Sequence, residues 1–517
     1  MSSFSYLHHL KVFSLTIGLL VMVACTPPEE RFPADPEDYC KEVTFQHNTS
    51  ITEQLTPYSS YINNKKTGVY VLEQGTEAMF TRAWLSEHAQ NTIDVQYFIF
   101  STDNIGLLGI DYLVRAADRG VKVRILVDDI MLEAKGDELL TLNAHPNISI
   151  KIYNPLANVG KNILQKLTNL VTDFHGFNQR MHNKTFTVDN LVSITGGRNV
   201  ADEYFGYDHQ YNFRDRDALL VGEAPKQIEQ SFEQFWKHKL SVPVSELLSD
   251  DNSNIKPNFE KLHQYACNPK NFLPEVRAQI KAMPAAFKQA AESGDVYWLD
   301  NVEYVSDAPG KNDAETFLGG SGIATNRLIQ LVEQANTSIT IQTPYLISTD
   351  LSQEIFKSLV AKGVKIKILT NSLASNDNLD AFSGYQRSRE ALLQTGIQIF
   401  EFKPDAKIRQ KVMSQEMLRQ LDQQPIFGLH AKSMVIDDHL TVIGTFNLDP
   451  RSANLNTESI VVIPSHSVAE KVKATMLVEM QPENAWHTTL DWNPDQEVDL
   501  SKRLKVKTRM IVPKSIL

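Results

Sequence analysis

The stretch from His182 to Asp189, which reads His-Asn-Lys-Thr-Phe-Thr-Val-Asp, has a counterpart in His430 to Asp437, which reads His-Ala-Lys-Ser-Met-Val-Ile-Asp. In both copies a lysine follows the histidine by two positions and an aspartate follows the lysine by five. One match to so short a pattern would mean little. Two matches at identical spacing indicate a duplicated unit, so we expect two halves of similar fold.

Each copy continues to a glycine-containing turn that ends in an asparagine, Gly196-Gly197-Arg198-Asn199 in the first and Gly444-Thr445-Phe446-Asn447 in the second. The asparagine stands at the same offset from the histidine in both copies. Each half therefore offers one imidazole, one ammonium and one amide to a shared site. The candidate catalytic residues are His182, Lys184, Asn199, His430, Lys432 and Asn447.

The motif residues fit an extended strand. Positions of equal parity share a face of a strand, so each histidine lies on the same side as its lysine. The following runs, Thr185 to Val188 and Ser433 to Ile436, are rich in residues that favour strands. Asp189 and Asp437 have the opposite parity and stand where the strands end, so we expect them to fix turns and leave them out of the catalytic set.

These residue types suit the cleavage or transfer of a phosphodiester. Without a metal, that reaction needs a nucleophile, a proton donor for the leaving oxygen, and fixed positive charge around the phosphoryl oxygens. Two histidines can divide the first two roles, since imidazole titrates near neutral pH. Two lysines and two amides can hold the oxygens. The sequence shows no obvious metal-binding cluster, and we expect neither a metal nor a cofactor.

Each imidazole also needs an acceptor that orients it. Alignment of the two halves places Asp217 opposite Glu458, each at the start of an apolar run downstream of a motif. We expect these two carboxylates to orient the histidines. The alternative is that each only caps the end of a strand.

Helices and strands are expected to alternate in the same order in both halves, which favours an α/β fold with mostly parallel strands and a pseudo-two-fold axis. The expected helices are 77–90, 105–119, 326–335, 351–362 and 468–476. The expected strands are 92–98, 121–127, 217–221, 338–342, 364–369 and 458–462. We assign residues 62–241 to a first lobe, 242–317 to a linker, 318–480 to a second lobe, and 481–517 to a tail that wraps around the body.

The N-terminus resembles a secretion signal. An apolar run from Val12 to Ala24 is too short to span a bilayer comfortably, and Cys25 follows it at once. We therefore expect residues 1–24 to be a signal peptide, Cys25 to be lipidated, and residues 25–61 to be a spacer. An uncleaved anchor in the inner membrane is the alternative. Either would tether the body to a membrane.

Composition narrows the partners. The chain has 517 residues and a net charge of −11, a poor match for a polyanion, so we expect no nucleic-acid partner. Besides Cys25 it has Cys40 and Cys267. These two could pair in an oxidising compartment, or Cys267 could be a small buried residue.

The paired motifs resemble the phospholipase D superfamily over about residues 75–480. Arg180 to Lys184, Asp202 to Phe205, and Asp449 to Ser452 resemble bacterial cardiolipin synthases of the C type. Thr445 departs from the serine usual in that group but keeps its hydroxyl. The resemblance implies two phospholipase D-like lobes with the active site at their interface.

The resemblance also implies roles. His182 would form a covalent phosphohistidine, His430 would act as general acid and base, and Asp217 and Glu458 would each support the histidine of the opposite half. The implied enzyme is a phosphatidyltransferase. From the N-terminal sequence, and not from the resemblance, we expect it to be a membrane-associated lipoprotein that faces the periplasm. It would make cardiolipin from phosphatidylglycerol with phosphatidylglycerol or phosphatidylethanolamine as donor. Water in place of the acceptor would give phosphatidic acid, and a metal-independent nuclease and a non-catalytic lipid-binding scaffold are less favoured alternatives.

Overall fold

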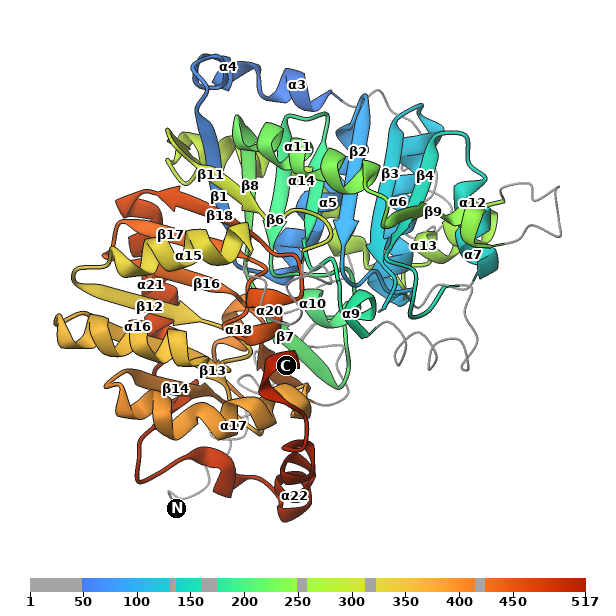
Figure 1. Ribbon diagram of the computed structural model, residues 1–517. Helices are drawn as coiled ribbons and strands as arrows, with labels where there is room; N and C mark the ends of the chain where they lie inside the picture. Colours follow the sequence, from blue (N-terminus) through green and yellow to red (C-terminus); the bar gives the residue numbers. More distant parts are fainter. Residues whose placement is uncertain are drawn as a thin grey trace, which may run out of the picture.

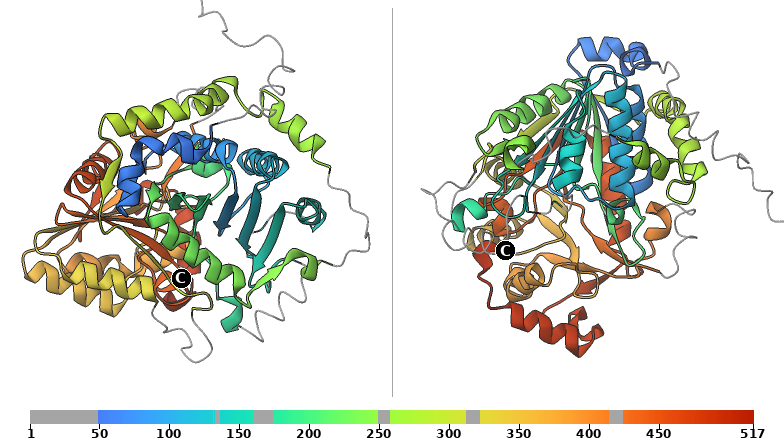
Figure 2. Two further views of the ribbon diagram at one scale, coloured as in Figure 1. Left: turned by 90° about the horizontal axis from the view of Figure 1, so that it is seen from above. Right: turned by 90° about the vertical axis from the view of Figure 1, so that its right-hand side faces the viewer.

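The computed structural model of the chain describes residues 49–130, 132, 136–159, 174–248, 258–311, 322–413 and 424–517. They form two lobes, each a mixed β-sheet with helices on both faces (Figures 1 and 2). The expected α/β fold with two similar lobes is confirmed. The expected signal peptide, Cys25, Cys40 and most of the spacer lie outside the described residues. Within the described part, no helix is both long and apolar enough to cross a bilayer.

The two sheets repeat one topology. The first has the strand order β10-β1-β8-β6-β5-β2-β3-β4-β9, and the second has β11-β18-β17-β16-β12-β13-β14-β19. The first-sheet strands are β1 (Thr67–Leu72), β2 (Thr92–Tyr97), β3 (Lys122–Asp128), β4 (Ile148–Tyr153), β5 (Thr185–Val188), β6 (Val192–Gly196), β8 (Asp217–Gly222), β9 (Ser241–Pro243) and β10 (Tyr297–Leu299). The second-sheet strands are β11 (Glu303–Ser306), β12 (Ser338–Gln342), β13 (Lys365–Asn371), β14 (Gln398–Phe402), β16 (Ser433–Ile436), β17 (Leu440–Gly444), β18 (Ser459–Pro464) and β19 (Ala485–Thr488).

Helices cover both faces of each sheet. On the first sheet, one face carries α5 (Gly75–His88), α6 (Asn104–Asp118), α13 (Glu260–Cys267) and α14 (Pro274–Glu292), and the other carries α11 (Ala224–Lys237). On the second, one face carries α15 (Ile323–Glu333), α16 (Asp350–Ala361) and α17 (Leu379–Gln394), and the other carries α21 (His466–Glu479). The C-terminal α22 (Leu500–Arg509) packs on α17. Shorter helices are α3 (Ile51–Gln54), α4 (Ser59–Asn63), α7 (Gly136–Asn143), α9 (Phe174–Phe177), α10 (Asp202–Phe205), α12 (Val244–Leu247), α18 (Arg409–Val412), α20 (Pro450–Asn454), η1 (Thr56–Tyr58), η2 (Pro494–Glu497) and η3 (Lys514–Ile516).

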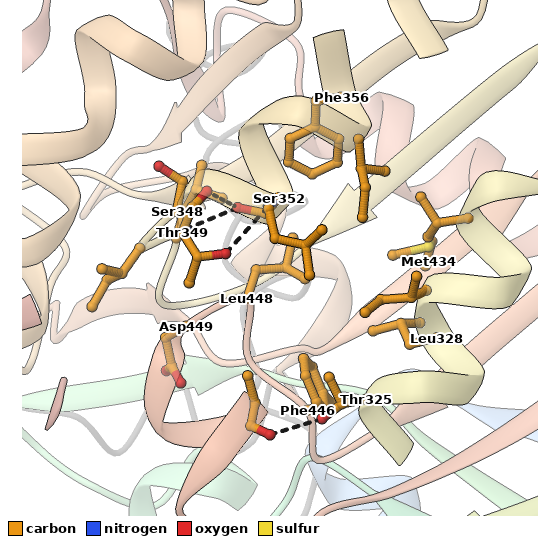
Figure 3. Close-up of a pocket in the computed structure, with 17 residues that line it drawn as sticks. Thr325, Leu328, Ser348, Thr349, Ser352, Phe356, Met434, Phe446, Leu448 and Asp449 are labelled. Atoms are coloured by element: carbon orange, nitrogen blue, oxygen red, sulfur yellow. Dashed lines mark hydrogen bonds between the residues drawn. The ribbon is translucent and has the colours of Figure 1, made fainter. Parts of the chain in front are cut away.

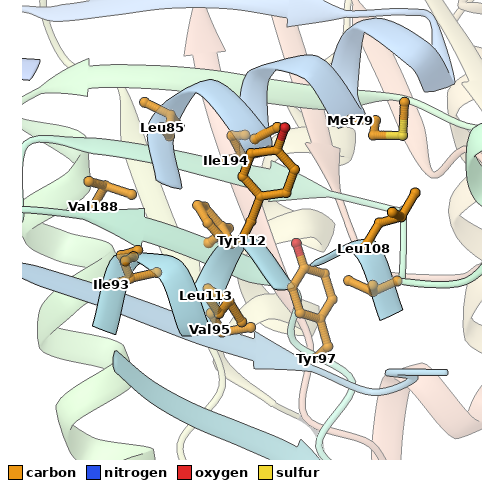
Figure 4. Close-up of a cluster of buried hydrophobic side chains, with 14 of the residues drawn as sticks. Met79, Leu85, Ile93, Val95, Tyr97, Leu108, Tyr112, Leu113, Val188 and Ile194 are labelled. Carbon is orange, nitrogen blue, oxygen red and sulfur yellow. The ribbon is translucent and has the colours of Figure 1, made fainter. Parts of the chain in front are cut away.

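Each sheet has an apolar core on its helix-rich face, and a third core joins the lobes. In the first lobe, side chains of α5 and α6 such as Leu85 and Leu113 meet Ile93 and Val95 of β2 (Figure 4). The third core lies between α11 and α21 and combines side chains of both sheets. Because it includes Leu220 from one sheet and Val461 from the other, the lobes share buried apolar surface rather than meeting through a linker alone.

The expectation of mostly parallel strands holds for the α/β units but is wrong for the rest of each sheet. Parallel pairing occurs in β2-β3-β4 and in β12-β13-β14. The neighbouring pairs β5-β6 and β16-β17 are antiparallel. The physical reason is connection length: a helix links successive parallel strands, whereas a short turn such as that between β5 and β6 can join only antiparallel ones.

Two segments expected to lie outside the lobes instead complete the sheets. The segment 242–317 contributes α13 and α14 to the first lobe, β10 to the edge of the first sheet, and β11 to the edge of the second. The tail after residue 480 contributes β19, which pairs with β14. These short strands complete pairing at sheet edges, where open backbone groups would otherwise be exposed.

The two motif aspartates fix turns, as expected. Asp189 and Asp437 both have a φ of 51° and begin the reverse turn of their hairpins. The carboxylate of Asp189 accepts the backbone N–H groups of Gln90, Asn91 and Thr92 at 2.7–2.9 Å. In the second lobe, Asp437 does the same for residues 336–338 at 2.8–3.0 Å. Each carboxylate therefore ties the motif hairpin to the first strand of its α/β unit.

Replacement of Asp437 by alanine should lower the free energy of unfolding by about 1–3 kcal/mol, because three backbone donors lose a charged acceptor and alanine is strained at positive φ. Asp437→Asn should cost less, since asparagine tolerates this conformation and keeps one acceptor. Thermal denaturation measures both. Equal stability of wild type and Asp437→Ala would contradict the assignment.

Candidate active site

The first candidate histidine is held by a carboxylate of the other lobe. Nδ1 of His182 lies 2.9 and 3.0 Å from the two carboxylate oxygens of Glu458, which is fully buried just before β18. Burial lowers the pKa of His182 to about 4, with Glu458 acting in the opposite direction. Burial also disfavours the Glu458 anion, but His182 and Lys184 outweigh that effect and lower its pKa. The pair is thus a neutral imidazole oriented by a carboxylate.

The second histidine has the equivalent arrangement with a residue that the sequence comparison missed. Nδ1 of His430 lies 2.6 Å from the carboxylate of Asp215. The prediction that Asp217 orients this histidine is wrong. Asp217 instead pairs with Arg82 at 2.9 Å and accepts the backbone N–H of Arg198 at 3.3 Å.

Strand register explains the error. In the first sheet Gly196 pairs with Asp217, whereas in the second sheet Gly444 pairs with Ile460. Asp217 therefore corresponds to Ile460, and the residue that corresponds to Glu458 is two positions earlier, Asp215. In the sequence, Asp215 and Asp217 have the same parity along the strand, so either could face His430. Alignment of the apolar runs alone could not decide which of the two does.

Each histidine is brought to the opposite lobe by backbone pairing. The N–H of His182 donates to the carbonyl of Thr457 at 3.0 Å, directly before Glu458. The N–H of His430 donates to the carbonyl of Arg214 at 2.8 Å, directly before Asp215. Ahead of His430, β15 (Ile426–Leu429) lies parallel to β7 (Tyr211–Arg214) of the first lobe. The site is therefore built by crossed segments at the lobe interface.

The two lysines lie in the same buried site. Nζ of Lys184 donates to the carbonyl of His182 at 2.8 Å, and Nζ of Lys432 donates to that of His430 at 2.7 Å. Burial, reinforced by the charge of Lys432, lowers the pKa of Lys184 to about 7. Burial lowers that of Lys432 to about 8. Each ammonium also lowers the pKa of the histidine in the other lobe, so the four side chains share one electrostatic environment.

The motif asparagines have different surroundings. Oδ1 of Asn199 accepts the backbone N–H of Ile99 at 3.1 Å, which holds that amide in place. Within the described residues, Oδ1 of Asn447 is buried without a hydrogen-bond partner. The hydroxyl of Thr445 donates to Glu458.

Gly197 is the counterpart of Thr445 in the first half. The space around Gly197 does not admit a side chain. A Cβ at this position would lie 2.1 Å from Oδ1 of Asp215. The carboxylate that orients His430 thus occupies the space of the missing side chain. The two halves of the site are therefore similar but not identical around their carboxylates.

Aromatic and apolar side chains surround the polar groups. The ring of Phe98 lies 5.0 Å from that of His182, and Tyr204 and Phe213 lie 5.0 and 4.9 Å from that of His430. These walls limit water around both imidazoles and contribute to their depressed pKa values. Among the described residues, no group of three or more histidine, cysteine, aspartate or glutamate side chains is arranged to hold a metal.

An apolar cavity adjoins the site in the second lobe. A small cavity of about 20 Å³, lined in part by Lys432, shares Leu328, Met434, Phe446 and Leu448 with a larger one of about 130 Å³. In Figure 3, Phe356 and Phe446 lie at opposite ends of the larger cavity, with Met434 and Leu328 along one side. Since Met434 follows Lys432 by two positions, both side chains lie on one face of the strand.

Cys267 lies apart from this site. It is disulfide-bonded and buried. Cys40, the partner considered from the sequence, lies outside the described residues.

This chain is similar to several known proteins over most of their length. The chain is 32% identical to cardiolipin synthase C of Escherichia coli K12 over 441 residues, which cover 84% of this chain and 89% of that protein. It is 33% identical to an uncharacterized protein of Helicobacter pylori J99 over 430 residues, which cover 83% and 82% of the two chains. Phosphatidylserine synthase of Haemophilus influenzae Rd KW20 shares the fold, with a TM-score of 0.57, 15% identity, and coverage of 90% of this chain and 100% of that one.

Residues 85–236 and 328–477 each match the family model described as "Cardiolipin synthase, PLD-like domain". One range falls within each lobe, and each contains one histidine–lysine motif. The chain therefore belongs to the phospholipase D-like cardiolipin synthase domain family.

Proposed function

We propose that this protein is a phosphatidyltransferase that makes cardiolipin, transferring a phosphatidyl group through a covalent phosphohistidine to the glycerol hydroxyl of phosphatidylglycerol. Its family and its relatives support a phospholipid-modifying enzyme of the phospholipase D type. The observation that carries the proposal is the paired site, in which each lobe supplies a histidine and a lysine and each histidine contacts a carboxylate of the other lobe.

His182 is the nucleophile in this proposal. Its Nδ1 is engaged by Glu458, and within the described residues its Nε2 has no hydrogen-bond partner. At His430, by contrast, the ammonium of Lys432 lies 3.0 Å from Nδ1 and 3.1 Å from Nε2, so both ring nitrogens have a charged neighbour. A neutral imidazole with a free Nε2 can attack phosphorus, which forms a P–N bond as the P–O bond to the departing headgroup breaks.

His430 is the general acid and then the base. It gives a proton to the departing glycerol or ethanolamine oxygen, and later takes the proton from the hydroxyl of the acceptor, which attacks phosphorus as the P–N bond breaks. Burial and Lys432 lower the pKa of His430 to about 3 in the ligand-free site. An anionic phosphate beside Lys432 would offset the charge of that ammonium, which lowers the pKa of His430, and Asp215 would stabilise the imidazolium form.

The same charges favour an anionic substrate. Both lysines are buried, and Lys432 is close enough to lower the pKa of Lys184, so a phosphodiester would supply counter-charge. The apolar cavity beside Lys432 suits a lipid substrate better than a nucleic acid. We further propose that the protein is membrane-associated, with residues 1–24 removed and Cys25 lipidated on the periplasmic side.

The product decides between transfer and hydrolysis. Purified protein with labelled phosphatidylglycerol, with and without phosphatidylethanolamine, should yield cardiolipin by mass spectrometry. His182→Ala should lower turnover by about 1,000-fold or more, because the covalent step is lost. Phosphatidic acid as the sole product would replace the proposal with a hydrolytic phospholipase D, and full activity of His182→Ala would remove that residue from the nucleophile role.

Asp215, just before β8, and Asp217, at its start, should differ in function, one affecting catalysis and the other stability. Asp215→Asn should lower kcat by about 100-fold or more and move the acid limb of the pH profile, because His430 loses the charge that stabilises its imidazolium. Asp217→Asn should lower the melting temperature through its arginine contacts while kcat changes little. The reverse result would restore Asp217 as the orienting carboxylate.

Lysine burial predicts an anion-dependent stability. The unfolded chain keeps its lysine protons up to a pH of about 10.4, so stability falls as the pH falls from there toward the folded values of about 7 and about 8. At pH 7, Lys184→Met should therefore raise the melting temperature of the protein measured without added anion, and inorganic phosphate should stabilise wild type more than this variant. The exposed Lys357→Met is the matched control, and an equal phosphate effect in both variants would refute the anion site.

The same pKa values predict a kinetic effect. The value of kcat/KM should decline as the pH rises through this range, because the two lysines lose their charge.

A further inference from the structure

The C-terminal helix is basic although the protein is acidic. From Leu500 to the C-terminus the chain has no acidic residue, while its overall net charge is −11. The basic residues of this segment are Lys502, Arg503, Lys505, Lys507, Arg509 and Lys514. A surface of this sign favours contact with anionic groups.

The same segment exposes large apolar side chains. The exposed fractions are 63% for Leu500, 52% for Leu504 and 88% for Ile511. On a helix of 3.6 residues per turn, Leu500 and Leu504 lie about 40° apart and form one apolar stripe on α22, and Ile511 follows just beyond the end of the helix. Solvent exposure of such a stripe is unfavourable unless something covers it.

The opposite face is anchored, which fixes the direction of the stripe. Val506 is fully buried in the core of the second lobe. Arg387 of α17 donates to the carbonyls of Met510 and Val512 at 3.2 and 2.8 Å. The helix therefore cannot turn its apolar stripe inward without breaking these contacts. Figure 1 shows α22 at the lower edge of the second lobe.

This surface lies beside the active-site region. Nζ of Lys502 donates to the carbonyl of Ala374 at 3.4 Å, next to the loop that contains Asp377. Burial raises the pKa of Asp377, and Lys432 of the active site opposes that effect. The helix and the catalytic lysine thus flank the same loop.

We propose that α22 is an interfacial helix that binds the surface of a bilayer containing anionic phospholipids. Leu500, Leu504 and Ile511 enter the boundary between headgroups and acyl chains. Lys507, on the same face as Leu500 and Leu504, lies against the lipid phosphates, and Lys505 and Arg509 add to the positive potential of the segment. This inference rests on the proposed action on lipids. A nucleic acid or an acidic protein would match the charge, but neither would explain the exposed apolar side chains of the same segment.

Vesicle binding by the full chain tests the proposal. Wild type should sediment with vesicles of equimolar phosphatidylcholine and phosphatidylglycerol, and less with phosphatidylcholine alone. The variant L500S/L504S/I511S should bind the mixed vesicles about tenfold or more weakly, because apolar burial is lost. The variant K505Q/K507Q/R509Q should lose the preference for phosphatidylglycerol. V478S/K357Q, which changes exposed residues on other helices, is the matched control and should bind like wild type.

Turnover of monomeric dihexanoyl phosphatidylglycerol separates this proposal from the proposed function. Both α22 variants should keep wild-type turnover of that soluble substrate and lose turnover of vesicle lipid. Unchanged vesicle binding would overturn the interfacial role, as would an equal loss of both activities, which would make the stripe a support for the fold. A change confined to the oligomeric state, seen by gel filtration, would assign the stripe to a second copy of the chain instead. Absence of turnover in wild type would count against the proposed function and leave the vesicle-binding result as an independent test.

Discussion

The site depends on the pairing of each motif segment with the backbone of the other lobe. The residue before each orienting carboxylate, Thr457 in one case and Arg214 in the other, accepts the N–H of the opposite histidine. Side-chain contacts from Glu458 and Asp215 then hold the same two histidines. Because the backbone bonds and the carboxylate contacts use adjacent residues, the position of each imidazole is determined by the other lobe.

This arrangement requires the lobes to be docked firmly. The core between α11 and α21 contributes apolar burial from both sheets. A buried polar network adds direct links: Arg214 of the first lobe contacts Glu479 of the second at 2.5 Å, and Arg216 contacts Gln342 at 2.5 Å. Loss of either member of the Arg214–Glu479 ion pair would leave an uncompensated buried charge, so this contact favours one relative position of the lobes.

Burial of the candidate catalytic groups determines their protonation as well as their position. Burial keeps both imidazoles neutral and lowers the pKa of both lysines, and the charge of Lys432 adds to the effect on Lys184. Burial of these groups lowers stability at neutral pH, and the proposed anionic substrate would supply the counter-charge that offsets this cost.

The sequence by itself determined the repeat, the alternation of helices and strands, and the role of the turn aspartates, because these follow from spacing and local backbone preference. The expected strand 338–342 and the helix 105–119 match β12 and α6 closely. Tertiary structure alone decided that Asp215 rather than Asp217 orients His430, because strand register is set by pairing across the sheet. It also decided that segment 242–317 completes both sheets, since short edge strands such as β10 and β11 have no local signal and form only when a neighbouring strand offers unpaired backbone groups.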